Sequence, residues 1–179
     1  MRLEKLTDNF REALADAQSK AIGKDNQFIE PIHMMMALLE QKGTVYHVLQ
    51  KARVNITKLQ STLNDALEKL PKVEGTAGEV HISNDLLKLL NVADKLAQQR
   101  KDQFIASELF LLAAIDDKGS LGKILKDSGA IKSILEQAID AVKERLVERP
   151  SDDCFRLLSA LWETNKELKY AEDKQTTFE

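Results

Sequence analysis

An internal duplication constrains the fold of this chain more than any other feature of its sequence. The stretch that begins at Asn26 returns at Asp102, an offset of 76 residues, and the copies align without a gap to Leu49 and Leu125. Seven of the 24 aligned positions are identical, and most of the others exchange similar residues. Each copy of such a repeat exposes a face that its neighbour covers. Two copies are too few for a solenoid, so the duplication predicts a compact pair related by a pseudo-two-fold axis.

The same offset relates the residues on both sides of this stretch. Upstream, the apolar residues Leu6, Phe10, Leu14, Ala17 and Ala21 align with Ile82, Leu86, Leu90, Ala93 and Ala97. Downstream, Leu59, Leu63, Ala66 and Leu70 align with Leu135, Ile139, Val142 and Leu146. We therefore predict a double-repeat domain over residues 1–148, with repeat one at 1–71, a linker at 72–81 and repeat two at 82–148.

Composition favours helices in a globular protein of the cytoplasm. Aromatic residues make up only 5% of the chain, and there are seven glycines and three prolines. The net charge of −3 gives no basic field for nucleic acid or for an anionic membrane surface. No apolar run is long enough for a membrane span, and no signal-peptide pattern is present. The single cysteine, Cys154, agrees with a reducing compartment.

The spacing of apolar residues, together with capping and stop residues, predicts an all-α fold. The expected helices are 7–22, 32–41, 44–52 and 55–70 in repeat one, and 83–100, 107–117, 120–127 and 131–147 in repeat two. Phe28 and Ile29 read as a short apolar plug rather than a strand. Pro150 marks a boundary, after which residues 149–179 form a tail of unknown role with a ninth helix that Asp152 can cap.

The sequence shows no catalytic, cofactor or metal motif. The string at 119–124 lacks the glycine spacing and the hydroxyl residue of a phosphate loop, so no nucleotide cofactor is expected. The histidines His33, His47 and His81 have no spacing typical of metal ligands. No Ser/His/Asp or Cys/His set can be assembled, and Cys154 is most simply a small apolar residue of the tail helix. The chain is therefore not expected to be an enzyme.

Positions that break the repeat symmetry indicate a binding surface. Val92 and Leu96 lie one helical turn apart, and their counterparts in repeat one are Asp16 and Lys20. Because the shared positions already account for the core face of both helices, this apolar pair predicts an exposed flank. The alternative is that repeat two packs against the C-terminal tail through this flank.

Helix 107–117 supplies a third residue of this kind. Leu109 aligns with the polar His33, which adds it to the predicted apolar groove of Val92, Leu96 and Leu109. The run Met34–Met36 aligns with Phe110–Leu112 and is interpreted as core filler rather than as a pliable binding surface.

Several strings resemble the N-terminal domains of the ClpB family of bacterial disaggregases. They are RLEKLTDNFREALADAQSKA, DNQFIEPIHMMMALLEQ, KLPKVEGTAGEVHIS and DKLAQQRKDQFIASELFLLAA, and the resemblance covers about residues 1–147. It implies an eight-helix, two-repeat module that engages unfolded or aggregated polypeptide and passes it to ATPase rings. It also implies a polar set of substrate-binding residues, Thr7, Asp102 and Glu108, beside the apolar groove. The alternatives are that Thr7 only caps a helix and that the two acidic residues belong to a solvated face.

The function expected from these observations is a non-enzymatic substrate-recognition module of a disaggregase. Its partners would be unfolded or aggregated polypeptides and the ATPase domains of a ClpB-like hexamer, with the isolated chain a monomer. This chain contains neither of the family's two ATPase domains with their phosphate loops, and its tail does not resemble the family's linker. The first alternative is an adaptor or regulatory protein that binds a partner through its C-terminal helix. The second alternative is a small enzyme.

Overall fold

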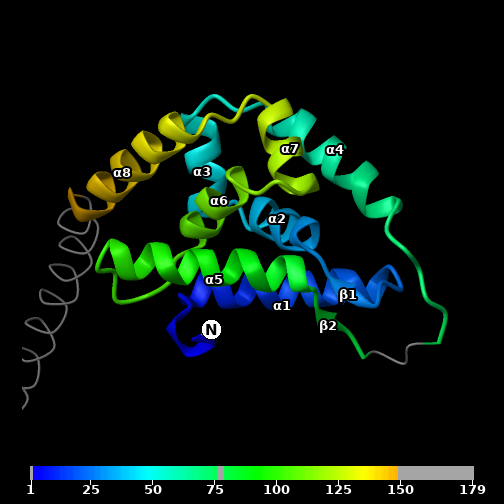
Figure 1. The fold of residues 1–179 in the computed structure, drawn as a ribbon. Helices are drawn as coiled ribbons and strands as arrows, with labels where there is room; N and C mark the ends of the chain where they lie inside the picture. The colour runs from blue at the N-terminus through cyan, green and yellow to red at the C-terminus, as the bar shows by residue number, and fades with distance from the viewer. Residues whose placement is uncertain (1, 76–78, 149–179) are drawn as a thin grey trace, which may run out of the picture. The chain divides into compact units, whose positions relative to one another are not determined.

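The computed structural model describes residues 2–75 and 79–148, which form eight α-helices with only short extended segments (Figure 1). Repeat one contains a 3-10 turn at Leu3–Lys5, α1 (Asp8–Gly23), β1 (Phe28–Ile29), α2 (Pro31–Glu40), α3 (Thr44–Lys51) and α4 (Ile56–Glu68). Repeat two contains β2 (His81–Ile82), α5 (Asn84–Gln99), α6 (Ser107–Ile115), α7 (Ser120–Asp127) and α8 (Lys132–Glu148). The all-α prediction is confirmed. The ninth helix expected in the tail lies outside the described residues.

The first helix of each repeat begins at a hydroxyl cap. The side chain of Thr7 accepts a hydrogen bond from the backbone N–H of Phe10 at 3.4 Å, and that of Ser83 accepts one from Leu86 at 3.1 Å. Pro31 occupies the first turn of α2, where a missing N–H removes no helical hydrogen bond. Repeat positions therefore agree in their caps as well as in their apolar spacing.

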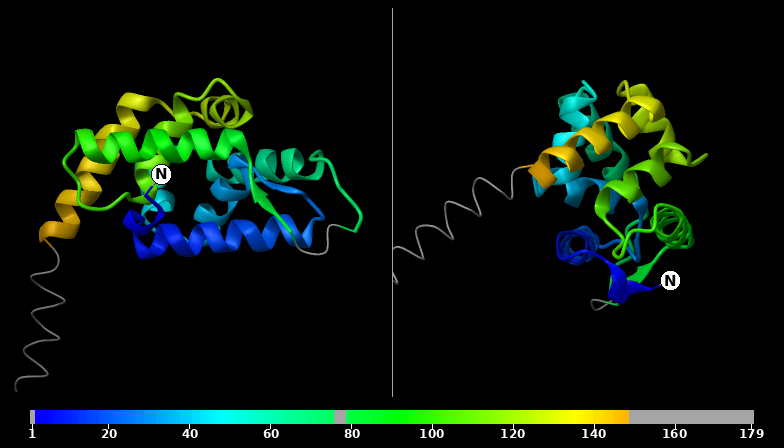
Figure 2. Two further views of the ribbon diagram at one scale, coloured as in Figure 1. Left: turned by 60° about the horizontal axis from the view of Figure 1, so that its bottom comes forward. Right: turned by 90° about the vertical axis from the view of Figure 1, so that its left-hand side faces the viewer.

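Helices α2 and α6 form the centre of the core. Every residue from Pro31 to Leu39 and from Ser107 to Ile115 is buried, which confirms that Met34–Met36 are core residues. The surrounding helices α1, α3, α4, α5 and α7 each bury one face only. Figures 1 and 2 show α1 and α5 on one side of the two central helices and α3, α4 and α7 on the other.

The two repeats interlock across the pseudo-two-fold axis. A parallel bridge joins Leu6 to Ile105, and β1 pairs with β2 so that Ile29 lies opposite Ile82. The offset of 76 residues converts one of these pairs into the other, so each repeat lends its N-terminal segment to its twin. Helix α3 also packs on α6, α2 on α5, and α4 on α7. Residues up to Ile139 belong to this unit, and residues 140–148 continue α8.

The expectation that Phe28 and Ile29 form a plug rather than a strand is wrong. They form β1, which pairs in parallel with His81 and Ile82. Local sequence gives no hint of this pairing, because the partner strand arrives only at the far end of the linker. Ile29 is buried by the pairing, whereas the Phe28 side chain stays exposed.

Candidate functional site

Helix α5 presents the apolar pair that the repeat comparison singled out. Its inner face is buried through Leu86, Leu90 and Ala93, while Val92 is 41% exposed and Leu96 is half-buried. The position of Val92 at the surface agrees with the predicted exposed flank. Leu96 contributes only part of its side chain to that surface.

Asp102 lies in the segment that joins α5 to α6, and Thr7 contacts that segment. The backbone N–H of Asp102 donates to the carbonyl of Ala97 at 2.9 Å, which fixes Asp102 against the last turn of α5. The backbone N–H of Thr7 donates to the carbonyl of Ile105, near the other end of this segment, at 3.0 Å. The fold thus brings Leu96, Asp102 and Thr7 to one region, although they come from both repeats. Both polar side chains are half-buried.

Two of the six predicted site residues are not at the surface. Leu109 is completely buried and Glu108 is only 5% exposed, because α6 is buried along its whole length. The prediction that Leu109 lines an exposed groove is therefore wrong in this structure. For the same reason Glu108 lies neither at the surface, as its predicted role in substrate binding requires, nor on a solvated face, which was the alternative. Glu108 lies in the first turn of α6, where the helix dipole favours a carboxylate.

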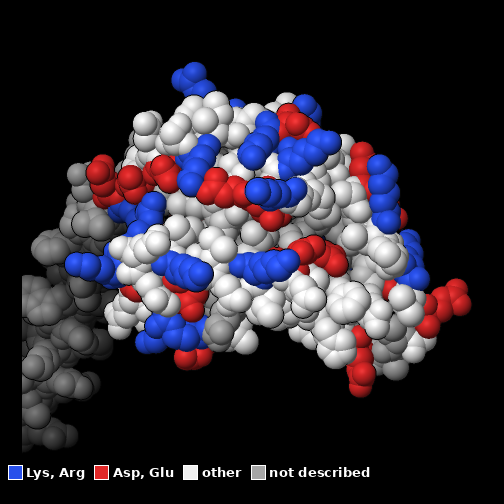
Figure 3. Space-filling model, in the orientation of Figure 1, with Lys and Arg blue, Asp and Glu red and all other residues white. Residues whose placement is uncertain are grey.

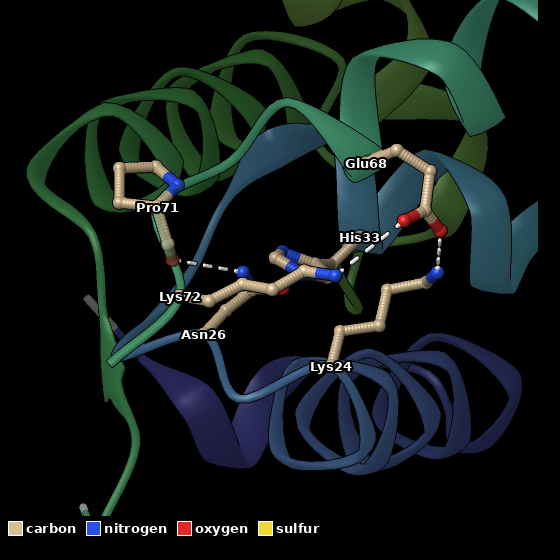
Figure 4. Close-up of polar contacts among 6 residues, drawn as sticks. All are labelled: Lys24, Asn26, His33, Glu68, Pro71 and Lys72. Carbon is tan, nitrogen blue, oxygen red and sulfur yellow. Dashed lines mark hydrogen bonds and ion pairs between the residues drawn. The ribbon is translucent and has the colours of Figure 1, made fainter. Parts of the chain in front are cut away.

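The reasoning that placed Leu109 at the surface failed at His33, because His33 is buried rather than solvated. His33 Nδ1 accepts a hydrogen bond from the backbone N–H of Glu30 at 2.9 Å, and Nε2 lies 3.0 Å from Asn26 Oδ1. The side-chain amide of Asn26 donates in turn to the carbonyl of Pro71 at 3.1 Å (Figure 4). Burial lowers the pKa of His33 to about 4, and the charges of Lys24 and Lys20 act in the same direction. The neutral ring with its proton on Nε2 satisfies both neighbours.

Ion pairs hold the surface elements around these sites. Arg2 Nη2 lies 2.6 Å from Asp94 Oδ1, and this charged hydrogen bond holds the pKa of the Asp94 carboxyl below its usual value. Glu68 at the end of α4 pairs with Lys24 and, at 3.6 Å, with Lys72 (Figure 4). On the face drawn in Figure 3, lysine and arginine side chains alternate with acidic ones, so that face carries no large patch of one sign.

The described residues contain no group of three His, Cys, Asp or Glu side chains that could hold a metal ion. Across the same part of the chain, no helix combines the length and the apolar character that crossing a membrane requires.

Comparison with known proteins gives a family match and many relatives. The model of the "Clp repeat (R) N-terminal domain" matches residues 5–128. Chaperone protein ClpB of Vibrio vulnificus (strain YJ016) is 44% identical over 144 residues, which is 80% of this chain. The match takes in only 17% of that relative, so the chain spans about a sixth of the length of the curated relatives it matches first.

Solved structures show the same fold. The Hsp104 N-terminal domain from Candida albicans superposes with a TM-score of 0.69 at 24% identity, covering 78% of this chain and 91% of that one. A complex of the ClpV N-domain with a VipB peptide superposes with a TM-score of 0.63 at 20% identity, covering 75% and 89%. At these identities the likeness concerns the fold alone.

Proposed function

This chain belongs to the Clp repeat (R) N-terminal domain family, and on that premise we propose that it is a polypeptide-binding module of a ClpB-like chaperone. It takes up apolar stretches of unfolded or aggregated protein, and the bound segment passes to the ATPase domains of a larger assembly. The chain itself binds and does not catalyse. The match to a small part of much longer chaperones supports this division of labour.

The observation that carries the proposal is the apolar pair on α5, of which Val92 is exposed and Leu96 is half-buried. Val92 and Leu96 occupy positions where the twin helix α1 carries Asp16 and Lys20, so the repeat fold does not need apolar residues there. Burying such surface against an apolar segment of a substrate is favourable by about 25 cal/mol per Å². We assign these two side chains to substrate contact.

Polar residues at the end of α5 complete the proposed surface. The backbone of Asp102 is fixed beside the last turn of α5, and we infer that its carboxylate favours segments with a basic residue near the apolar one. Thr7 caps α1, and its backbone N–H donates to the carbonyl of Ile105 in the segment that joins α5 to α6. Glu108 and Leu109 are buried and are not assigned to direct contact.

A matched pair of variants on one helix tests the proposal. The double variant Val92→Ser/Leu96→Ser removes the apolar pair, whereas Leu87→Ser removes from another part of α5 a leucine that is 42% exposed, close to the 41% of Val92. Binding of a fluorescent, reduced and carboxymethylated polypeptide is followed by anisotropy. We expect the double variant to bind about five-fold more weakly or worse, and the control to stay within about two-fold of the parent.

Thermal unfolding of the same variants separates a loss of binding from a loss of the fold. Leu96 is half-buried, so its truncation lowers the free energy of unfolding by about 1 kcal/mol. Equal losses in the double variant and in Leu87→Ser would refute a specific role for the pair. If neither variant changes binding, the repeats act as scaffold, and the adaptor function of the C-terminal tail becomes the better account.

A further inference from the structure

Repeat one contains a pocket that is separate from the surface on α5. Its volume is about 280 Å³, and it lies between β1, the beginning of α2 and the residues that follow α4. The walls are formed mainly by Phe28, Leu70, Pro71 and Val73, with Glu30 at one side and the buried Asn26 at another. This volume lies below the range of about 300–1,000 Å³ typical of sites for drug-sized molecules. It suits a single side chain better than a whole small molecule.

The apolar wall is exposed but held in place. Phe28 is 44% and Val73 is 37% exposed, which leaves adjoining apolar surface open to solvent. The side-chain amide of Asn26 donates a hydrogen bond to the carbonyl of Pro71, and the backbone N–H of Val73 donates to the carbonyl of Asp25 at 2.8 Å. These two hydrogen bonds fix the segment after α4 against the residues just before β1, so the pocket is preformed; Figure 4 shows the first of the two.

The outer edge of β1 offers backbone groups beside the pocket. The N–H of His81 donates to the carbonyl of Gln27, and the N–H of Ser83 donates to the carbonyl of Ile29, both at 3.1 Å. In a parallel ladder of this register the N–H and C=O of Phe28 point to the opposite side. The sheet has two strands, so within the described residues no strand pairs with that edge. Such an edge can accept an extended segment as an added strand.

The charge of the lining indicates what kind of segment fits. Glu30 is half-buried and, among the described residues that line the pocket, is the only ionisable one. A carboxylate without a cation among the lining residues favours a basic side chain on the incoming segment. In Figure 3 the surface over β1 and β2 is mostly uncharged, with both acidic and basic side chains around it.

We propose that this pocket is a second polypeptide-binding site, which takes one apolar side chain of an extended segment. The backbone of that segment pairs with Phe28 on the open edge of β1, and a neighbouring lysine or arginine meets Glu30. The site does not depend on Val92 or Leu96, because it is built from repeat one and the start of the linker.

Repeat two supplies a control for this proposal. Phe104 is the counterpart of Phe28 and is exposed to a similar degree, 48%. The sequence positions that would complete an equivalent pocket differ in chemistry. Ala106 aligns with Glu30, and the counterparts of Pro71 and Val73 are Val147 and Arg149. Phe104→Ser therefore removes the same side chain from a similarly exposed position without touching the pocket.

The test uses the full chain, labelled with ¹⁵N and methyl ¹³C, and the acetylated, amidated hexapeptide Thr-Lys-Leu-Thr-Leu-Thr. Titration should shift the backbone amide of Phe28 and the methyl groups of Leu70 and Val73. Phe28→Ser should weaken binding at these signals about five-fold or more, and Phe104→Ser should change it less than about two-fold. Val92→Ser/Leu96→Ser should leave these shifts in place, which separates this site from the one on α5.

Two further measurements test the strand pairing with β1 and the role of the Glu30 carboxylate. A peptide that is N-methylated along its backbone should bind much more weakly, because it cannot complete the strand pairing with β1. Glu30→Gln should remove the preference for the lysine peptide over its Thr-Thr-Leu-Thr-Leu-Thr analogue. The proposal is overturned if the shifts are confined to α5, if Phe104→Ser weakens binding as much as Phe28→Ser, or if N-methylation has no effect.

Discussion

His33→Leu gives the sharpest test of how repeat one is stabilised, because repeat two carries Leu109 at the same position. The substitution removes the ring proton that lies against Asn26 Oδ1 and the nitrogen that accepts from the Glu30 N–H. Asn26 is buried, so its oxygen loses a partner that water cannot replace. An orphaned buried acceptor costs about 1–3 kcal/mol. We expect the variant to be about 2 kcal/mol less stable at pH 7.5.

The same variant should lose this disadvantage in mild acid. The folded-state pKa of His33 is lowered to about 4, whereas an unfolded histidine titrates near pH 6.5. Because the folded pKa is the lower one, neutral His33 costs no stability above about pH 6.5, and stability is lost as the pH falls towards 4. At pH 5, which lies about 1.5 units below the pKa of an unfolded histidine, protonation of the unfolded chain lowers the free energy of unfolding by about 2 kcal/mol relative to pH 7.5. Leucine does not titrate, so the stabilities of parent and variant should meet near pH 5.

Urea unfolding followed by circular dichroism at pH 7.5 and pH 5.0 measures both effects in one experiment. His47→Gln serves as the control, because the side chain of His47 is exposed on α3. It should follow the pH dependence of the parent. A difference between His33→Leu and the parent that stays constant from pH 7.5 to pH 5.0 would refute the assignment of a buried neutral imidazole.

Two further predictions concern packing and charge. Gly122→Ala should destabilise the domain by about 2 kcal/mol, because a Cβ there would lie 2.0 Å from the carbonyl oxygen of Asp117. Gly23→Ala, which meets no atom within 4 Å at the end of α1, should be neutral or stabilising in the same thermal melts. Arg2→Ala should raise the pKa of the Asp94 carboxyl towards its usual value, which ¹³C NMR titration detects; an unchanged midpoint would contradict the role given to Arg2.

The duplication made most of the fold predictable from the sequence. Helix positions followed from apolar spacing, and residue type narrowed the caps to Thr7 or Asp8, to Asn55 or Thr57, and to Ser83, of which the structure has Thr7, Asn55 and Ser83. These features depend on interactions within a few residues along the chain. The pairing of β1 with β2 was missed because it joins segments that lie on opposite sides of three helices and the linker.

The candidate site was less predictable, because the same symmetry argument succeeded on α5 and failed on α6. On α5 one face is exposed, so a polar counterpart such as Asp16 correctly marked Val92 as a surface position. On α6 every face is buried, and the polar counterpart His33 is buried as well. A polar residue in a repeat indicates solvent only where its hydrogen bonds are not made inside the protein. The neighbouring Asn26 was the available signal that His33 had such a partner.

The two proposed surfaces together give a physical reason why an unfolded chain would be preferred over a folded one. Each surface offers only a few apolar contacts, so each alone should bind weakly. A flexible chain can reach both, and the second contact then occurs at the effective concentration set by the first. A folded protein buries most of its large apolar side chains and pairs most of its strand edges, so it seldom presents two such segments at once. Selectivity for unfolded protein then follows from having the α5 pair in repeat two and the Phe28 pocket in repeat one, at positions where the symmetry of the repeats is broken.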